Sequence, residues 1–83
     1  MAEVALTLLS RRDCGLCEAL EGELVTWDAG RALFSLNIID IDTDAELQRR
    51  YQWRIPVLLL GDEELCAGTL NEAALIAIEA AHG

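Results

Sequence analysis

Two cysteines, Cys14 and Cys17, are the residues of this sequence best suited to covalent chemistry, and Gly15 and Leu16 separate them. The apolar spacing of the residues after Cys14 predicts a helix that starts at this pair. At the start of a helix, unpaired amides and the positive end of the helix dipole lower the pKa of a thiol. We therefore expect Cys14 to be the nucleophile, with Cys17 one turn further along and shielded from solvent. The second thiol can then attack a mixed disulfide formed on the first.

Charged neighbours modify this prediction. Arg11 and Arg12 would further stabilise a thiolate, whereas Asp13 opposes it. The predicted site is thus a locally basic spot on a chain with 15 acidic and 6 basic residues and a formal net charge of -9. We expect so acidic a surface to repel both nucleic acid and anionic membranes.

Other uses of a Cys-x-x-Cys pair depend on the residues around it. A c-type haem site needs a histidine directly after the second cysteine, where this chain has Glu18. A structural zinc site needs four ligands, and only Cys66 and His82 remain as soft donors, so we predict no metal site within one chain. An inert pair of core thiols is a further interpretation. A pair that follows a strand and opens a helix favours redox chemistry.

The hydrophobic pattern predicts the elements that must position these thiols. Apolar and β-branched runs predict four strands, of which the first is buried on both faces and the last two form a hairpin: Val4–Leu9, Phe34–Ile41, Ile55–Leu60 and Glu64–Ala67. Helical spacing predicts three helices, which run from Cys14 to about Asp28, from Thr43 to about Tyr51 and from Ala73 to His82. The order βαβαββα predicts one domain over residues 1–83, an α/β fold with a four-stranded mixed sheet and helices packed on it.

Some local features carry separate predictions. Thr43 and Glu46 have the spacing of a capping box, with Thr43 as the cap, whereas Thr69 and Asn71 both qualify as caps of the last helix. We expect Cys66 to be an apolar residue of the hairpin, with a regulatory or glutathionylated thiol as the alternative. The aromatic residues are expected in the core or at its edge: Trp27, Phe34, Tyr51 and Trp53.

Taken together, the motifs resemble the glutaredoxin-like branch of the thioredoxin superfamily. The resemblance rests on Cys14 to Cys17 after the first strand, Ile55-Pro56 before the third, and Gly68 before the last helix. With residues 40–44 and Tyr51, the chain is similar in particular to small bacterial glutaredoxin-like proteins. The resemblance implies the thioredoxin fold, with Cys14 as nucleophile, Cys17 as resolving thiol and Pro56 in a cis peptide bond that faces the disulfide.

The resemblance also implies substrate-binding residues, namely Arg11, Ile55, Pro56, Gly68 and Asn71. A cis bond at Pro56 would let a substrate peptide or glutathione add as a short strand beside the backbone of Ile55. Arg11 stands where glutaredoxins carry a basic residue that meets a glutathione carboxylate. Asn71 stands where an Asp would pair with the glutathione amino group, so a charge-assisted contact becomes a neutral one. We expect no bound cofactor, with glutathione as a candidate co-substrate.

These observations predict a monomeric, cytoplasmic thiol-disulfide oxidoreductase. It would act on a protein or low-molecular-weight disulfide, with glutathione or a thioredoxin-type protein as reductant. The start, Met1-Ala2-Glu3, lacks the features of a signal peptide, and no apolar run reaches the roughly 20 residues of a membrane span. Two alternatives stay open: a non-catalytic peptide-binding or redox-sensing module of the same fold, and metal or iron-sulfur ligation by Cys14 across a dimer, against which Cys17 counts.

Overall fold

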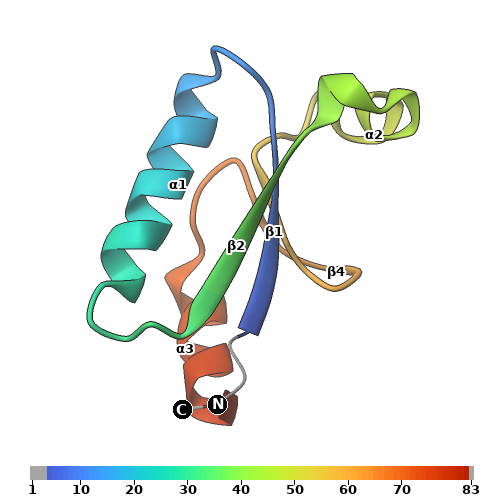
Figure 1. Cartoon of the computed structure of the whole chain (residues 1–83). Helices are drawn as coiled ribbons and strands as arrows, with labels where there is room; N and C mark the ends of the chain where they lie inside the picture. Colours follow the sequence, from blue (N-terminus) through green and yellow to red (C-terminus); the bar gives the residue numbers. More distant parts are fainter. Residues whose placement is uncertain (1–3, 83) are drawn as a thin grey trace.

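Four strands are hydrogen-bonded in the order β2-β1-β3-β4 in the computed structural model, which describes residues 4–82 (Figure 1). They are β1 (Val4–Ser10), β2 (Phe34–Asp40), β3 (Val57–Leu60) and β4 (Glu63–Ala67). Strand β1 pairs in parallel with β2 and antiparallel with β3, and β3 and β4 form an antiparallel hairpin. The mixed sheet confirms the predicted fold class.

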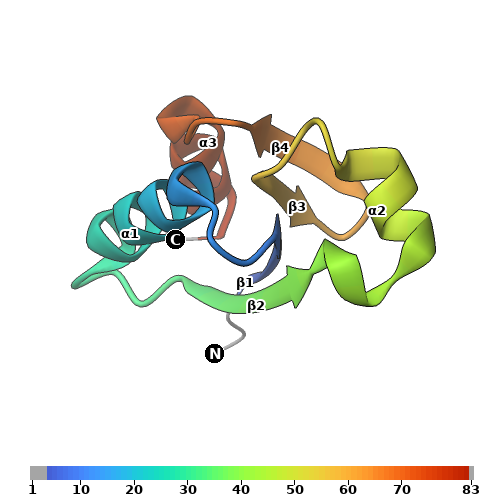
Figure 2. The same cartoon turned by 90° about the horizontal axis from the view of Figure 1, so that it is seen from above.

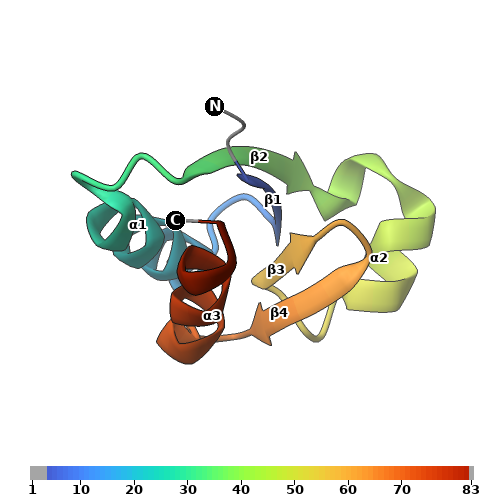
Figure 3. The same ribbon diagram turned by 90° about the horizontal axis from the view of Figure 1, so that it is seen from below.

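Helices cover both faces of this sheet. Figures 2 and 3 show α1 (Gly15–Asp28) and α3 (Glu72–His82) on one face and α2 (Ala45–Tyr51) on the other. A short 3-10 helix, η1 (Ile41–Thr43), connects β2 to α2. No helix within residues 4–82 is both long and apolar enough to cross a bilayer. The expectation about Met1-Ala2-Glu3 lies outside the described residues.

The apolar residues form one core on each face of the sheet. The larger core, below α1 and α3, contains Val4, Leu6, Leu8, Leu20, Leu24, Leu58, Leu75 and Ile78, and the smaller core, towards α2, contains Leu9, Ile41 and Val57. The consecutive residues Leu8 and Leu9 are both buried and point to opposite faces, as alternate strand residues do. Ala5 is exposed, so the predicted two-sided burial of this strand holds only for its second half.

The start of α2 differs from the prediction. Asp44, and not Thr43, is its N-cap, because the Asp44 carboxylate accepts hydrogen bonds from the amides of Glu46 (2.9 Å) and Leu47 (3.3 Å). The Thr43 hydroxyl instead donates to the carbonyl of Asp40 at 2.7 Å, within the 3-10 turn. That turn contains Ile41, which the sequence pattern assigned to the strand end, and Thr43, which it assigned to the cap, so the capping-box prediction was wrong.

Smaller findings concern the second half of the chain. Strand β3 begins at Val57, two residues later than predicted, and β4 begins at Glu63, one residue earlier. Asn71 caps α3, since its side-chain oxygen accepts from the amide of Ala73 at 3.1 Å, which decides between the two predicted caps. Trp53 is 89% exposed and is not a core residue.

Candidate functional site

The register of the sheet brings the predicted site residues to one edge. Ser10 at the end of β1 lies opposite Asp40 at the end of β2, and Leu9 lies opposite Val57. Val57 in turn lies opposite Ala67. The segments that flank these positions therefore meet at the same edge: the loop to Cys14, the turn after Asp40, Pro56 before β3 and Gly68 after β4.

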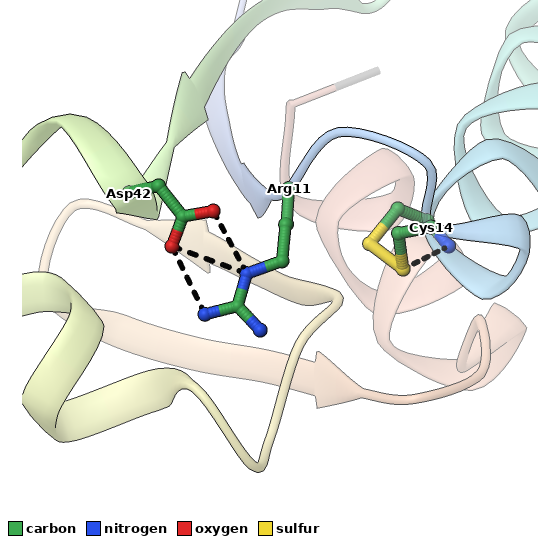
Figure 4. The surroundings of a disulfide bond; sticks show 4 residues. Arg11, Cys14 and Asp42 are labelled. Carbon is green, nitrogen blue, oxygen red and sulfur yellow. Dashed lines mark hydrogen bonds and ion pairs between the residues drawn. A yellow bond between two sulfur atoms is a disulfide. The ribbon is translucent and has the colours of Figure 1, made fainter.

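Cys14 and Cys17 are joined by a disulfide at the start of α1, with their Cα atoms 5.2 Å apart (Figure 4). Cys14 is itself the N-cap of the helix, and its sulfur accepts a hydrogen bond from the Cys17 amide at 3.2 Å. Asp13 adopts a left-handed conformation (φ 56°), which aspartate tolerates, where the loop turns into the helix. The cap position thus holds the Cys14 sulfur against an amide at the positive end of α1.

The two sulfur-bearing residues differ in their access to solvent. Cys14 is partly exposed, whereas Cys17 is only 2% exposed and lies on the buried side of α1. Leu16, between them, is 60% exposed. The predicted shielding of Cys17 is confirmed. An incoming reagent therefore has access to Cys14 first.

Arg11 does not face the disulfide. Its guanidinium forms a bidentate ion pair with Asp42, with Nε 3.0 Å from Oδ2 and Nη2 3.0 Å from Oδ1. Figure 4 shows this side chain directed towards Asp42 and not towards Cys14. The Asp42 carboxylate also accepts from the Gln48 side-chain amide at 3.0 Å. The expected basic environment of Cys14 is therefore reduced, because a carboxylate neutralises one of its two arginines.

Asp42 is a residue that sequence reasoning missed. The signal that could have found it is the parallel pairing of β1 with β2, because residues that follow two parallel strands lie at the same edge of the sheet. Arg11 follows one strand, and Asp42 follows the other by two residues. Opposite charges in those two places predict an ion pair.

Pro56 and Gly68 lie next to each other at this edge. The Ile55-Pro56 peptide bond is cis, as the resemblance implied, and the Gly68 amide donates to the Pro56 carbonyl at 2.7 Å. Gly68 has φ +83°, a conformation that other residues rarely adopt. Pro56 is buried and Ile55 is half-buried. The backbone just before β3 and the backbone just after β4 are thus held together near the first turn of α1.

A small cleft separates the first two turns of α1 from the segment after β4. Its volume is about 120 Å³, and it is lined by Leu16, Ala19, Leu20, Glu23, Gly68, Thr69 and Leu70. Binding sites for whole small molecules usually measure roughly 300 Å³ or more, so this space suits a single side chain. Leu16 connects the cleft to the two cysteines.

A wider groove of about 720 Å³ follows α1 further along and is lined by Glu18, Ala19, Gly22, Glu23, Thr26, Trp27 and Glu72. Its three carboxylates belong to Glu18, Glu23 and Glu72, which form no ion pair within residues 4–82. Neither cysteine lines this groove, and Glu18 is the residue that borders the disulfide. The surface on this side of Cys14 is therefore acidic.

Cys66 lies apart from the disulfide, in β4. Burial raises the pKa of its thiol, the Asn71 backbone amide opposes this shift, and the carboxylate of Glu64 adds to it. The predicted hairpin position is confirmed, and the side chain is partly buried against the larger core. Within the part of the chain that the structure describes, no three His, Cys, Asp or Glu side chains come together as a group that could hold a metal ion.

Comparisons with known proteins agree with this geometry. The model of the Glutaredoxin-like domain (DUF836) family matches residues 5–78. The solution NMR structure of protein Ne2328 from Nitrosomonas europaea is 30% identical, covers 94% of this chain and 93% of its own, and superimposes with a TM-score of 0.80. No functionally curated protein matches the sequence.

Two further structures extend the comparison. The X-ray structure of protein XcR50 from X. campestris is 29% identical over 94% of this chain and 99% of its own, with a TM-score of 0.67. The germline-specific thioredoxin Deadhead of Drosophila melanogaster is 23% identical over 95% and 80% of the two chains, with a TM-score of 0.55, and shares the fold. The chain therefore belongs to the glutaredoxin-like family of thioredoxin-fold proteins.

Proposed function

We propose that this protein is a thiol-disulfide oxidoreductase in which Cys14 is the nucleophile and Cys17 the resolving thiol. The observation that carries the proposal is the disulfide at the start of α1, with one partly exposed and one buried partner. In the reduced protein, the Cys17 amide that donates to the Cys14 sulfur would stabilise a thiolate there. The proposed compartment is the cytoplasm, where such a pair is kept reduced.

The reaction takes place in two exchange steps. The Cys14 thiolate attacks one sulfur of a substrate disulfide, whose S–S bond breaks, and the first substrate thiolate leaves and takes up a proton. Cys17 loses its proton to solvent and attacks the Cys14 sulfur, which releases the second substrate thiolate. Two electrons have passed to the substrate, which ends as two thiols, while Cys14 and Cys17 end as a disulfide.

A thiol reductant must then restore the dithiol. Two glutathione molecules, or one thioredoxin-type dithiol, would supply the two electrons and be oxidised to a disulfide. The buried position of Cys17 supports an intramolecular second step, because an external thiol has better access to Cys14. The proposed state is a monomer.

The substrate would lie along the edge formed by Ile55, Pro56 and Gly68. The Ile55 amide donates to the Tyr51 carbonyl and the Pro56 carbonyl accepts from Gly68, so the Ile55 carbonyl is the backbone group we propose for an extended peptide. The small cleft beside Leu16 can take one of the peptide's side chains. A protein disulfide offers both features.

Trapping of the intermediate tests this proposal. We expect a Cys17→Ser variant, incubated with a disulfide peptide, to accumulate a mixed disulfide on Cys14, identified by mass spectrometry after tryptic digestion. The wild-type protein should instead release both peptide thiols and end with the Cys14–Cys17 disulfide. Absence of any adduct on Cys14 in the variant, together with no peptide reduction by the wild type, would refute it.

A second candidate is a non-catalytic peptide-binding or redox-sensing module. Two residues that the family resemblance assigns to glutathione binding already have internal partners, which favours this candidate. Arg11 is paired with Asp42, and the Asn71 side chain caps α3. Pull-down with the Cys17→Ser variant separates the two functions. An exchanging enzyme loses its captured partners on full reduction, whereas a module retains them.

A further inference from the structure

The ion pair between Arg11 and Asp42 joins the loop after β1 to the turn after β2, and both segments lie at the edge of the sheet that carries the disulfide. Four hydrogen-bond contacts hold the Asp42 carboxylate, three from Arg11 (3.0, 3.0 and 3.2 Å) and one from Gln48 (3.0 Å). The backbone beneath it is also fixed, because the Asp42 amide donates to the Asp40 side chain at 2.9 Å. The turn that carries Asp42, together with Gln48, therefore helps to hold the carboxylate where Arg11 meets it.

The pair is built more firmly than an ordinary surface ion pair. The side chains of Arg11 and Asp42 are 32% and 39% exposed, and their contact is bidentate. Planar, two-point contacts of this kind are the stronger class of arginine-carboxylate interaction. A substrate carboxylate that approaches Arg11 therefore meets a guanidinium whose charge is already neutralised and whose Nε and Nη2 donors are occupied.

The remaining charges near the dithiol do not replace Arg11. Asp13 and Glu18 flank the two cysteines and are exposed, and the groove beyond them carries Glu23 and Glu72. Arg12 is exposed and forms no ion pair within residues 4–82. An exposed arginine attracts an anion weakly, because solvent and salt screen it.

We propose that Asp42 is a specificity-determining residue that occupies Arg11 and so directs the dithiol away from small, carboxylate-bearing disulfides. The class selected against is represented by glutathione disulfide, and the class that remains is disulfides without a carboxylate near the exchanging sulfur, such as those in a protein chain. The inference rests on the proposed exchange activity of Cys14 and Cys17.

A single-turnover comparison of two small disulfides tests it. Reduced protein is mixed with anionic glutathione disulfide or with neutral bis(2-hydroxyethyl) disulfide, and formation of the Cys14–Cys17 disulfide is followed by acid quench. We expect Asp42→Ala to raise the rate constant for glutathione disulfide about fivefold relative to the neutral disulfide, the effect of one partly exposed ion pair worth about 1 kcal/mol. The more conservative Asp42→Asn should give a smaller gain.

Two control variants isolate the role of the pair. Glu46→Gln removes the same charge from a carboxylate that pairs with Arg49 in α2, and it should leave the ratio of the two rate constants unchanged. The double variant Arg11→Gln/Asp42→Ala should lose the gain, because the released guanidinium is then missing. A change in thiol reactivity alone would move both rate constants together and leave their ratio constant.

The outcomes separate this inference from the function on which it rests. An unchanged ratio in Asp42→Ala, an equal gain in Glu46→Gln, or a gain that survives in the double variant would overturn the role of Asp42. Reaction of the wild type with the neutral disulfide shows in each case that exchange itself takes place. Failure of the wild type to react with either disulfide would refute the proposed function, and the inference with it.

Discussion

Cys14 and Cys66 each lie next to a backbone amide at the start of a helix, but their surroundings differ. The Cys14 sulfur accepts from the Cys17 amide at the first turn of α1, and the residue is partly exposed. The Cys66 thiol lies by the Asn71 amide before α3, where burial raises its pKa and Glu64 adds to the shift. An amide contact at a helix start is therefore not enough to make a thiol reactive, because desolvation can outweigh it.

The two sites also differ in their partners. Cys14 has a second thiol three residues away, with which it forms a disulfide. Cys66 is the free cysteine of the described chain and lies in a strand beside a carboxylate. Exchange chemistry needs an accessible thiolate and a resolving thiol, and only the first site combines them.

The largest expected difference between the two sites is in activity. We predict that Cys14→Ser lowers the rate of disulfide reduction at least about a thousandfold, because the attacking sulfur is lost. The matched change Cys66→Ser should leave the rate within about a factor of two, since neither step uses that thiol. Steady-state assays with a disulfide peptide measure both. Equal losses of activity in the two variants would contradict the distinction between the two cysteine sites.

The next difference is in the pH dependence of alkylation. In a Cys14→Ser/Cys17→Ser background, Cys66 should react with iodoacetamide with a midpoint above the value of about 8.5 for a free thiol. The sign follows from its raised pKa, since a thiol with a raised pKa holds less thiolate at any given pH. Glu64→Gln should move the midpoint down, because one of the causes that raise it is removed. A midpoint below that of a free thiol would contradict the assignment of Cys66 as an unreactive residue.

The smallest expected effect is on stability. Asn71→Ala removes the side-chain cap of α3 and should lower the free energy of unfolding by about 1 kcal/mol, which corresponds to roughly 4–8 °C in Tm for a domain of this size. Asn71→Asp keeps an oxygen acceptor and should retain most of the stability. Thr69→Ala, at the other predicted cap, should change it by less than about 0.5 kcal/mol. Thermal unfolding followed by circular dichroism distinguishes these outcomes.

The sequence allowed the fold and the cysteine pair to be predicted because both depend on short-range patterns. The strands and helices follow from local periodicity, and the position of Cys14 at a helix start follows from the strand before it and the apolar spacing after it. The capping box at Thr43 was wrong for a local reason as well. Asp44 competes for the same role, and the 3-10 turn before it gives Asp44 the extended backbone that a cap requires.

The features that sequence reasoning missed depend on contacts between distant segments. Arg11 and Asp42 are 31 residues apart, and their pairing follows from the parallel register of β1 and β2. Trp53 is exposed although its size and apolar character favour burial, because the short turn after α2 leads it away from both cores. Residue type predicts whether a side chain gains from burial, whereas the topology decides which side chains find a place inside.

A redox titration of the Cys14–Cys17 pair tests whether the two thiols exchange electrons with a thiol-disulfide pool. The protein is equilibrated in thiol-disulfide buffers over roughly -120 to -300 mV, the span of known exchange proteins, and the free thiols are then alkylated and counted by mass spectrometry. The proposed function predicts a single two-electron transition in which the free thiols of Cys14 and Cys17 disappear together as the buffer becomes more oxidising. The Cys66→Ser variant should show the same transition at the same potential. A pair that stays fully reduced or fully oxidised across the whole range would contradict it.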